Sequence, residues 1–146
     1  MNLINFNLKA NRNFRMIPTY GLTHIALKVK DLERTAAFYH QVFGAVVMYK
    51  EDNFIQLQTP GSKDILVFEK ADYIPPNQSG ILHFGFRLVK PQDVQTLEDE
   101  IIEAGGTIKD KGQFVPGEPY VFFYDPDGYE VEVWYESIPE GMEGVN

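Results

Sequence analysis

The sequence predicts an α+β fold in which two tandem βαβββ modules form a curled, barrel-like mixed sheet around a cavity, with the helices outside. The strongest support is an internal repeat. The segment GLTHIALKV at 21–29 aligns without a gap with GILHFGFRL at 80–88, and residues 57–70 align with 123–136, proline on proline. Each repeat also places one amphipathic helical pattern between strand patterns. A duplicated unit therefore accounts for most of the chain.

The repeat also sets the expected domain organisation. In chain order, the expected segments are a variable leader (1–19), the first module (20–71), a linker (72–79), the second module (80–137) and a tail (138–146). Two consecutive prolines mark the linker as a break in regular structure. The two modules together are expected to form a single domain.

The first module begins with a strand, because the residues at 21–29 alternate between a more apolar and a less apolar face. Asp31 is a typical N-cap for the helical pattern at 32–43, and Gly44 is typical of the residue that ends a helix. Three further strands are expected, at 45–50, 53–58 and 64–70.

The second module repeats this order. Its first strand at 80–88 is followed by a helical pattern at 91–106, a short strand at 107–111 and a loop at 112–119 that contains glycine and proline. The module then ends in a hairpin.

The closing hairpin is the most informative stretch of the sequence. PYVFFY at 119–124 is aromatic and β-branched, so it predicts a buried strand, and DPDG at 125–128 is typical of a tight turn. After the turn, EVEVWY alternates strictly, which places Val131 and Val133 on the core side and Glu132 on the opposite face. A carboxylate at that position must be paired, solvated or bound to a metal.

Composition restricts the partners of the protein. A formal charge of −8 over 146 residues disfavours nucleic acid and anionic membrane surfaces. No run of about eighteen apolar residues is present, and asparagines interrupt the apolar stretch of the leader, so we expect neither a membrane span nor a signal peptide. The absence of cysteine rules out disulfides and thiolate ligands and is typical of a cytoplasmic protein.

Three potential ligand side chains are expected to meet in the cavity. His24 and His83 occupy the same register of the two matching strands, on the less apolar face of each, and Glu132 lies on the corresponding face of the last strand. A lone histidine is more often bonded to a backbone carbonyl, and a lone glutamate is more often a surface acid. The matched pair of histidines favours a shared site.

Other residues have the parity to line this cavity. They are Phe54, Gln56, Phe122 and Trp134. Aromatic residues on strands also occur as ordinary packing, so the pattern alone leaves both roles open. Lys28 and Arg87 lie on the same faces, where they either attract an anionic substrate or decorate the rim.

The motifs resemble those of the vicinal oxygen chelate superfamily, which includes glyoxalase I, fosfomycin-resistance enzymes, extradiol dioxygenases and bleomycin-resistance proteins. The resemblance rests on THIALKVKDLERTAAFYHQVFGA at 23–45, the histidine of ILHFGF at 81–86 and the hairpin FFYDPDGYEVEV at 122–133. It covers roughly residues 20–136.

This resemblance implies that His24, His83 and Glu132 bind one divalent metal ion, for which Fe(II), Mn(II), Ni(II) and Zn(II) are all suitable. It implies an enzyme of the glyoxalase type, an isomerase or lyase that chelates a small oxygenated substrate, with Glu132 as the catalytic residue. The alternatives are an extradiol dioxygenase-like activity, a fosfomycin thiol transferase-like activity, or a metal-free binding protein of the bleomycin-resistance kind. Exposed edge strands in such modules favour a homodimer.

The internal alignment adds one expectation about the number of ligands. It pairs Glu132 with Leu66 in the first module. The position of Leu66 resembles the one that holds a fourth metal ligand, a glutamate, in glyoxalase I. Leucine cannot bind a metal, and the parity of the neighbouring Glu69 places it on the helix-covered side or beyond the strand end. We therefore expect a site with three protein ligands.

Overall fold

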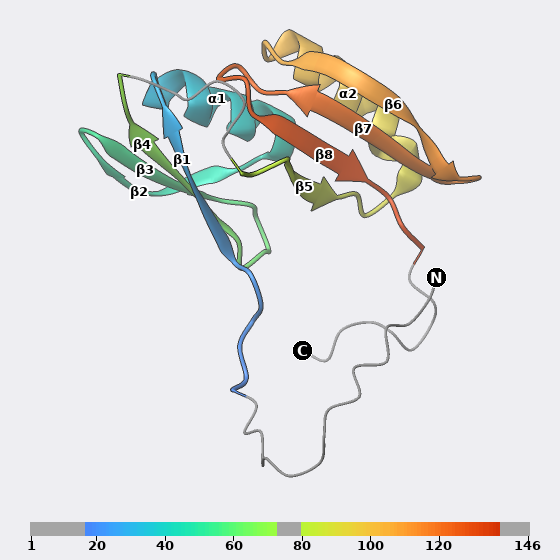
Figure 1. The fold of residues 1–146 in the computed structure, drawn as a ribbon, viewed down its shortest axis with the longest axis horizontal. Coiled ribbons are helices and arrows are strands. Elements are labelled where there is room, and N and C mark those ends of the chain that lie inside the picture. Colours follow the sequence, from blue (N-terminus) through green and yellow to red (C-terminus); the bar gives the residue numbers. More distant parts are fainter. Residues whose placement is uncertain (1–16, 73–79, 138–146) are drawn as a thin grey trace.

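The computed structural model describes residues 17–72 and 80–137, and Figure 1 shows its fold. Residues 1–16 of the predicted leader, residues 73–79 of the predicted linker and the predicted tail at 138–146 lie outside the described residues. The expected fold class is confirmed, because each half of the chain forms one βαβββ module. Neither helix in the described part of the chain is long and apolar enough to cross a membrane.

The first module follows the predicted order of elements. Its elements are β1 (His24–Val29), α1 (Leu32–Phe43), β2 (Val46–Glu51), β3 (Phe54–Gln58) and β4 (Ile65–Lys70). The Asp31 carboxylate accepts a hydrogen bond from the backbone N–H of Arg34 at the start of α1, and Gly44 ends the helix in the left-handed conformation at φ 68°. Both predicted helix boundaries are confirmed.

The second module differs from the prediction in its hairpin of β6 and β7. Its elements are β5 (Phe84–Arg87), a short 3-10 helix (Pro91–Asp93), α2 (Val94–Glu103), β6 (Thr107–Val115), β7 (Glu118–Tyr124) and β8 (Glu130–Trp134). The loop predicted at 112–119 is mostly strand, because β6 continues to Val115. Gly112 lies under the Tyr120 ring, where a Cβ atom would be 3.0 Å from the hydroxyl oxygen. The glycine at position 112 is therefore explained by close packing against Tyr120 and not by a loop.

The two modules form separate four-stranded sheets with the same topology. The strand orders are β1-β4-β3-β2 and β5-β8-β7-β6. In each sheet the first and last strands of the module pair in parallel, and the other pairs are antiparallel. The duplication inferred from the sequence is thus confirmed in the strand order. The two sheets do not close into one barrel within the chain.

One hydrophobic core joins the two modules. Helix α1 lies at the junction of the sheets (Figure 1), and it contacts both of them: the Tyr39 and Phe68 rings are 5.1 Å apart, and the Phe43 and Phe86 rings stack at 4.0 Å. The buried cluster includes residues of both modules. Each sheet therefore turns one face towards the shared core. We call the opposite face of each sheet, which carries His24 in the first and Glu132 in the second, its open face.

Candidate metal centre

The structure places His83 and Glu132 in direct contact. His83 immediately precedes β5, and the parallel pairing of β5 with β8 sets Gly85 opposite Glu132. The Nε2 atom of His83 lies 3.0 Å from Oε2 of Glu132. The two side chains are 30% and 15% exposed, so solvent can reach the pair but does not surround it.

The local sequence explains why this carboxylate faces away from the core. Val131 and Val133 are fully buried at 0% and 1% exposure, and strict alternation turns Glu132 to the other face of β8. The predicted parity of the last strand is therefore confirmed. Hydrophobic burial of the two valines fixes the register, because a slip by one residue would bury the carboxylate.

The pair has the chemistry of a divalent-metal site. Bonds of about 2.1 Å from one ion to an imidazole nitrogen and a carboxylate oxygen, at right angles, separate the two donor atoms by about 3.0 Å. The observed spacing suits such an ion as well as a hydrogen bond. The other ring nitrogen of His83, Nδ1, is buried and has no hydrogen-bond partner among the residues that the structure describes. The residues present therefore fit a metal ion, although two ligands alone do not complete a site.

His24 does not join this pair within one chain. It lies on β1, in the first sheet, and its side chain is exposed on the open face. Among the described residues, no three histidine, aspartate or glutamate side chains lie close enough together to hold a metal ion. The expected convergence of His24, His83 and Glu132 inside one chain is thus not observed. The reason is that the two open faces point away from the shared core.

The predicted cavity-lining residues are divided in the same way. Phe122 and Trp134 lie on the open face of the second sheet, and the Phe122 ring meets the His83 ring edge-on at 5.3 Å. Phe54 and Gln56 lie on the open face of the first sheet, where Gln56 pairs with Val67. Each open face therefore carries two of the four predicted residues.

Strand pairing corrects the internal alignment by one residue. Leu66 pairs with Ile25 and belongs to the core, as Val131 does in the second sheet, where it pairs with Phe84. The counterpart of Glu132 is therefore Val67, which is only 7% exposed but, unlike Leu66, lies outside the core cluster. The expectation for Leu66 was wrong, and the position still holds an apolar residue that cannot bind a metal.

The same correction moves Glu69 to the open face of the first sheet. Glu69 pairs with Lys28 and with Phe54, so it shares the parity of Val67 and is exposed. Glu69 and Phe54 also line a common hollow. The expectation that Glu69 faces the helix-covered side or lies beyond the strand end was wrong, because β4 runs to Lys70 and Glu69 lies on its open face.

Sequence patterns did not indicate that rings continue along the second open face. Tyr120 lies 5.6 Å from Phe122 and 4.2 Å from Phe114, with which it stacks. The alternation of β7 could have identified Tyr120 as a residue of the open face. Phe114 could not be identified in this way, because it lies in the segment predicted to be a loop. The Arg87 guanidinium donates to the backbone oxygen of Glu136 at 2.6 Å and lies 3.6 Å from its carboxylate. Arg87 is therefore already engaged by an acid.

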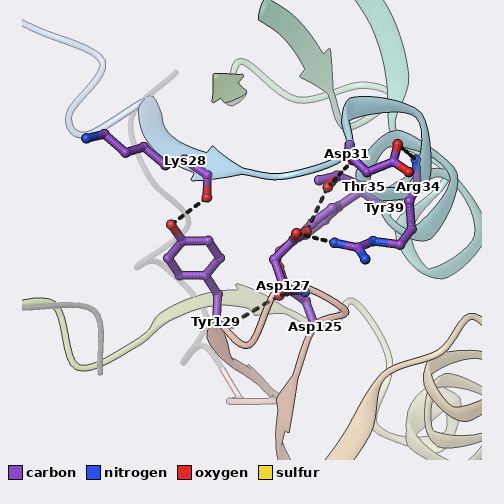
Figure 2. Close-up of polar contacts among 8 residues, drawn as sticks. All are labelled: Lys28, Asp31, Arg34, Thr35, Tyr39, Asp125, Asp127 and Tyr129. Atoms are coloured by element: carbon purple, nitrogen blue, oxygen red, sulfur yellow. Dashed lines mark hydrogen bonds and ion pairs between the residues drawn. The ribbon is translucent and has the colours of Figure 1, made fainter. Parts of the chain in front are cut away.

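A partly buried polar cluster connects the last turn to the first module (Figure 2). Asp127 accepts hydrogen bonds from Arg34 and from the Thr35 hydroxyl of α1, the latter at 2.7 Å. The Tyr129 hydroxyl donates to the backbone oxygen of Lys28 on β1 at 2.7 Å. The turn that leads into Glu132 is thus held against both α1 and β1.

Comparisons with known proteins agree with this fold. A family model described as the Glyoxalase/Bleomycin resistance protein/Dioxygenase superfamily matches residues 21–133. The chain is 27% identical over 119 residues to the glutathione transferase FosA of Serratia marcescens, covering 81% of this chain and 82% of FosA. It is 28% identical over 140 residues to the lactoylglutathione lyase GLX1 of Arabidopsis thaliana, covering 90% of this chain but only 47% of that relative.

Solved structures with a similar fold include members of the same superfamily. The fosfomycin resistance protein FosX of Listeria monocytogenes superposes with a TM-score of 0.70 at 26% identity, covering 84% of this chain and 97% of FosX. A structure of a FosX variant contains Mn(II) and 1S,2S-dihydroxypropylphosphonic acid, and it matches with a TM-score of 0.66 at 25% identity, covering 80% and 90% of the two chains.

Proposed function

The chain belongs to the glyoxalase/bleomycin resistance protein/dioxygenase superfamily, and on this premise we propose that it is a divalent-metal-dependent enzyme of the glyoxalase type. Its ligands are His24, His83 and Glu132, and its substrate is a small molecule with two neighbouring oxygens. The observation that carries the proposal is the contact of 3.0 Å between His83 and Glu132 on an open sheet face. Imidazole and carboxylate donors suit Mn(II), Fe(II), Ni(II) and Zn(II).

We propose that His24 reaches the ion from a second copy of the chain. The two open faces of one chain point away from the shared core, so a second chain is needed to bring His24 opposite the pair. Strands β1 and β5 are both edge strands. The apolar residues beside the two histidines are exposed, with Leu22 at 97%, Leu82 at 76% and Ile81 at 48%. Burial of such side chains is typical of a homodimer interface.

The residues around the ion have separate roles in this proposal. A bound divalent ion polarises the substrate oxygens and stabilises negative charge that develops on them. Glu132 holds the ion and accepts a proton from the substrate when its carboxylate is free to move. The rings of Phe122 and Trp134 contact the substrate from the same sheet, and Phe54 and Gln56 contact it from the partner's open face.

A second candidate activity is dioxygenase-like chemistry on an aromatic substrate. The row of rings formed by Phe122, Tyr120 and Phe114 favours a planar substrate group. A three-ligand site with an apolar Val67 in the fourth position also leaves coordination positions open to substrate. A phosphonate substrate is less favoured on this face, because Arg87 and Lys109 are already paired with Glu136 and Glu130.

Metal content tests the proposal. Purified protein reconstituted with Mn(II), Fe(II), Ni(II) or Zn(II) is expected to retain about one equivalent per chain after dialysis, and His83→Ala should lose it. His40→Ala is the matched control, because His40 lies on α1, where its Nδ1 atom is 3.0 Å from the backbone oxygen of Ala45. Wild-type protein that retains less than about a tenth of an equivalent would instead favour the metal-free binding protein.

A further inference from the structure

Gly85 lies beneath the candidate metal pair, and its missing side chain leaves space that other atoms fill. A Cβ atom placed on Gly85 would lie 3.1 Å from Cζ3 of Trp134, 2.9 Å from the backbone oxygen of Glu132 and 3.5 Å from the Cβ atom of Glu132. Distances this short leave no room for a methyl group in a close-packed structure. The indole of Trp134 thus lies against β5 beside the carboxylate that pairs with His83.

Backbone conformation does not explain this glycine. The glycines with positive φ in the described chain lie outside the strands, and Gly85 is not among them. The φ angle of residue 85 therefore suits alanine, and what opposes a Cβ atom is contact with the Glu132 backbone oxygen and the Trp134 ring. The requirement for glycine is one of space on the open face.

The first module has no indole at the position that matches Trp134. By strand register, the counterpart of Gly85 is Ala26, which opposes Val67, and the counterpart of Trp134 is Glu69, which opposes Lys28. A methyl group is thus present where no indole lies across the strand pair, and it is missing where one does. The duplicated sheet is an internal control that links residue 85 to residue 134.

We propose that Gly85 is a positioning residue, whose absent side chain lets the Trp134 indole form a fixed wall beside His83 and Glu132. The proposal rests on the proposed metal site for its function but not for its geometry. In this arrangement the indole limits the movement of the Glu132 carboxylate and gives the substrate a flat surface next to the ion. Outer-shell groups that orient metal ligands typically change metal affinity by about 10- to 100-fold.

Trp134 makes the test direct, because it is the only tryptophan of the chain. In metal-free protein, Gly85→Ala is expected to shift the tryptophan emission to longer wavelength and to increase quenching by acrylamide, because the displaced indole enters water. In reconstituted protein the same change is expected to weaken Mn(II) binding about tenfold, measured by calorimetric titration. Ala26→Gly, at the matching position of the first sheet, should change neither signal.

A double variant separates displacement of the ring from general damage to the sheet. Trp134→Val removes the ring, so Gly85→Ala should be better tolerated in that background, with a smaller loss of thermal stability than in the wild-type background. Equal losses in both backgrounds would overturn the proposal, since the contact with the Glu132 backbone would then dominate. Unchanged emission and quenching in Gly85→Ala would overturn it as well. Absence of metal binding in every form would contradict the proposed function, while the emission result would still decide the role of Gly85.

Discussion

The Tyr39 hydroxyl on α1 donates a hydrogen bond of 2.7 Å to Oδ2 of Asp125, in the turn that precedes β8. Both residues are buried, at 0% and 4% exposure, and they belong to different modules. Oδ1 of Asp125 accepts hydrogen bonds from the backbone N–H groups of Asp127 and Tyr129. This contact therefore anchors the turn to the first module and holds the β7–β8 hairpin in register.

Asp125 is expected to make the stability of the protein depend on pH. Burial raises the pKa of its carboxyl group from 3.8 to about 6, against the opposing effect of the hydrogen bonds from Tyr39 and Tyr129. The folded state then binds the proton more tightly than the unfolded state. The stability from this proton is fully present below about pH 4 and is lost as the pH rises through about 6, a change of about 3 kcal/mol.

Asparagine at this position should remove that dependence. Asp125→Asn cannot ionise, and its oxygen can still accept the two backbone hydrogen bonds, so its free energy of unfolding relative to wild type should rise between about pH 4.5 and 7.5. Urea unfolding across this range measures it. Asp31→Asn is the control, because the backbone N–H of Arg34 lowers the Asp31 pKa and keeps that group ionised throughout. A pH-independent difference between wild type and Asp125→Asn would contradict the prediction.

Arg34→Ala is expected to weaken the junction between the modules. The Asp127 side chain is 0% exposed, and Arg34 supplies its positive partner from α1. Removing the guanidinium leaves a buried carboxylate with the Thr35 hydroxyl as a remaining side-chain donor, at a cost of about 1–2 kcal/mol. Thermal unfolding measures the loss. Arg34→Lys keeps the charge and should lose less, whereas equal losses would show that the charge is irrelevant.

The features that sequence reasoning predicted well depend on local periodicity. Alternation in β8 predicted that Glu132 faces away from two valines, and the structure confirms it. The register is fixed because a slip of one residue would bury the carboxylate. Asp31 and Gly44 marked the ends of α1 through capping chemistry that needs no tertiary contact. The repeated strand order likewise followed from the duplicated pattern.

The features it missed depend on loop length and on the packing of whole modules. The connection between β3 and β4 is one residue longer than that between β7 and β8, so an ungapped alignment of the prolines moved Leu66 onto the place of Val67. A repeat also does not reveal which faces of two sheets meet. The shared core around α1 turned the open faces apart, and His24 was separated from His83 for that reason.

The corrected register predicts different outcomes at neighbouring positions. Val67→Glu should add a carboxylate to the open face that carries His24, and it is expected to tighten Mn(II) binding by supplying a fourth ligand. Leu66→Glu should instead place an unpaired carboxylate in the core and destabilise the fold by several kcal/mol. Calorimetric titration and thermal unfolding of both variants provide the measurements. Tighter binding by Leu66→Glu would show that the register is wrong.

Mixing two inactive variants tests whether the proposed site is shared between chains. His24→Ala and His83→Ala should each fail to bind the ion alone. A heterodimer of the two variants contains one site with His24 from one chain and His83 with Glu132 from the other. Random pairing after joint refolding of equal amounts then restores about one quarter of the wild-type metal content.

The controls distinguish this arrangement from a site within one chain. A site built from a single chain gives no recovery, because every chain in the mixture lacks one histidine. Mixing His83→Ala with Glu132→Ala should also give none, since both losses fall on the same half of the shared site. Recovery in that second mixture would contradict the assignment of His83 and Glu132 to one chain's half of the site. Metal content is measured by elemental analysis after dialysis, with the oligomeric state checked by light scattering.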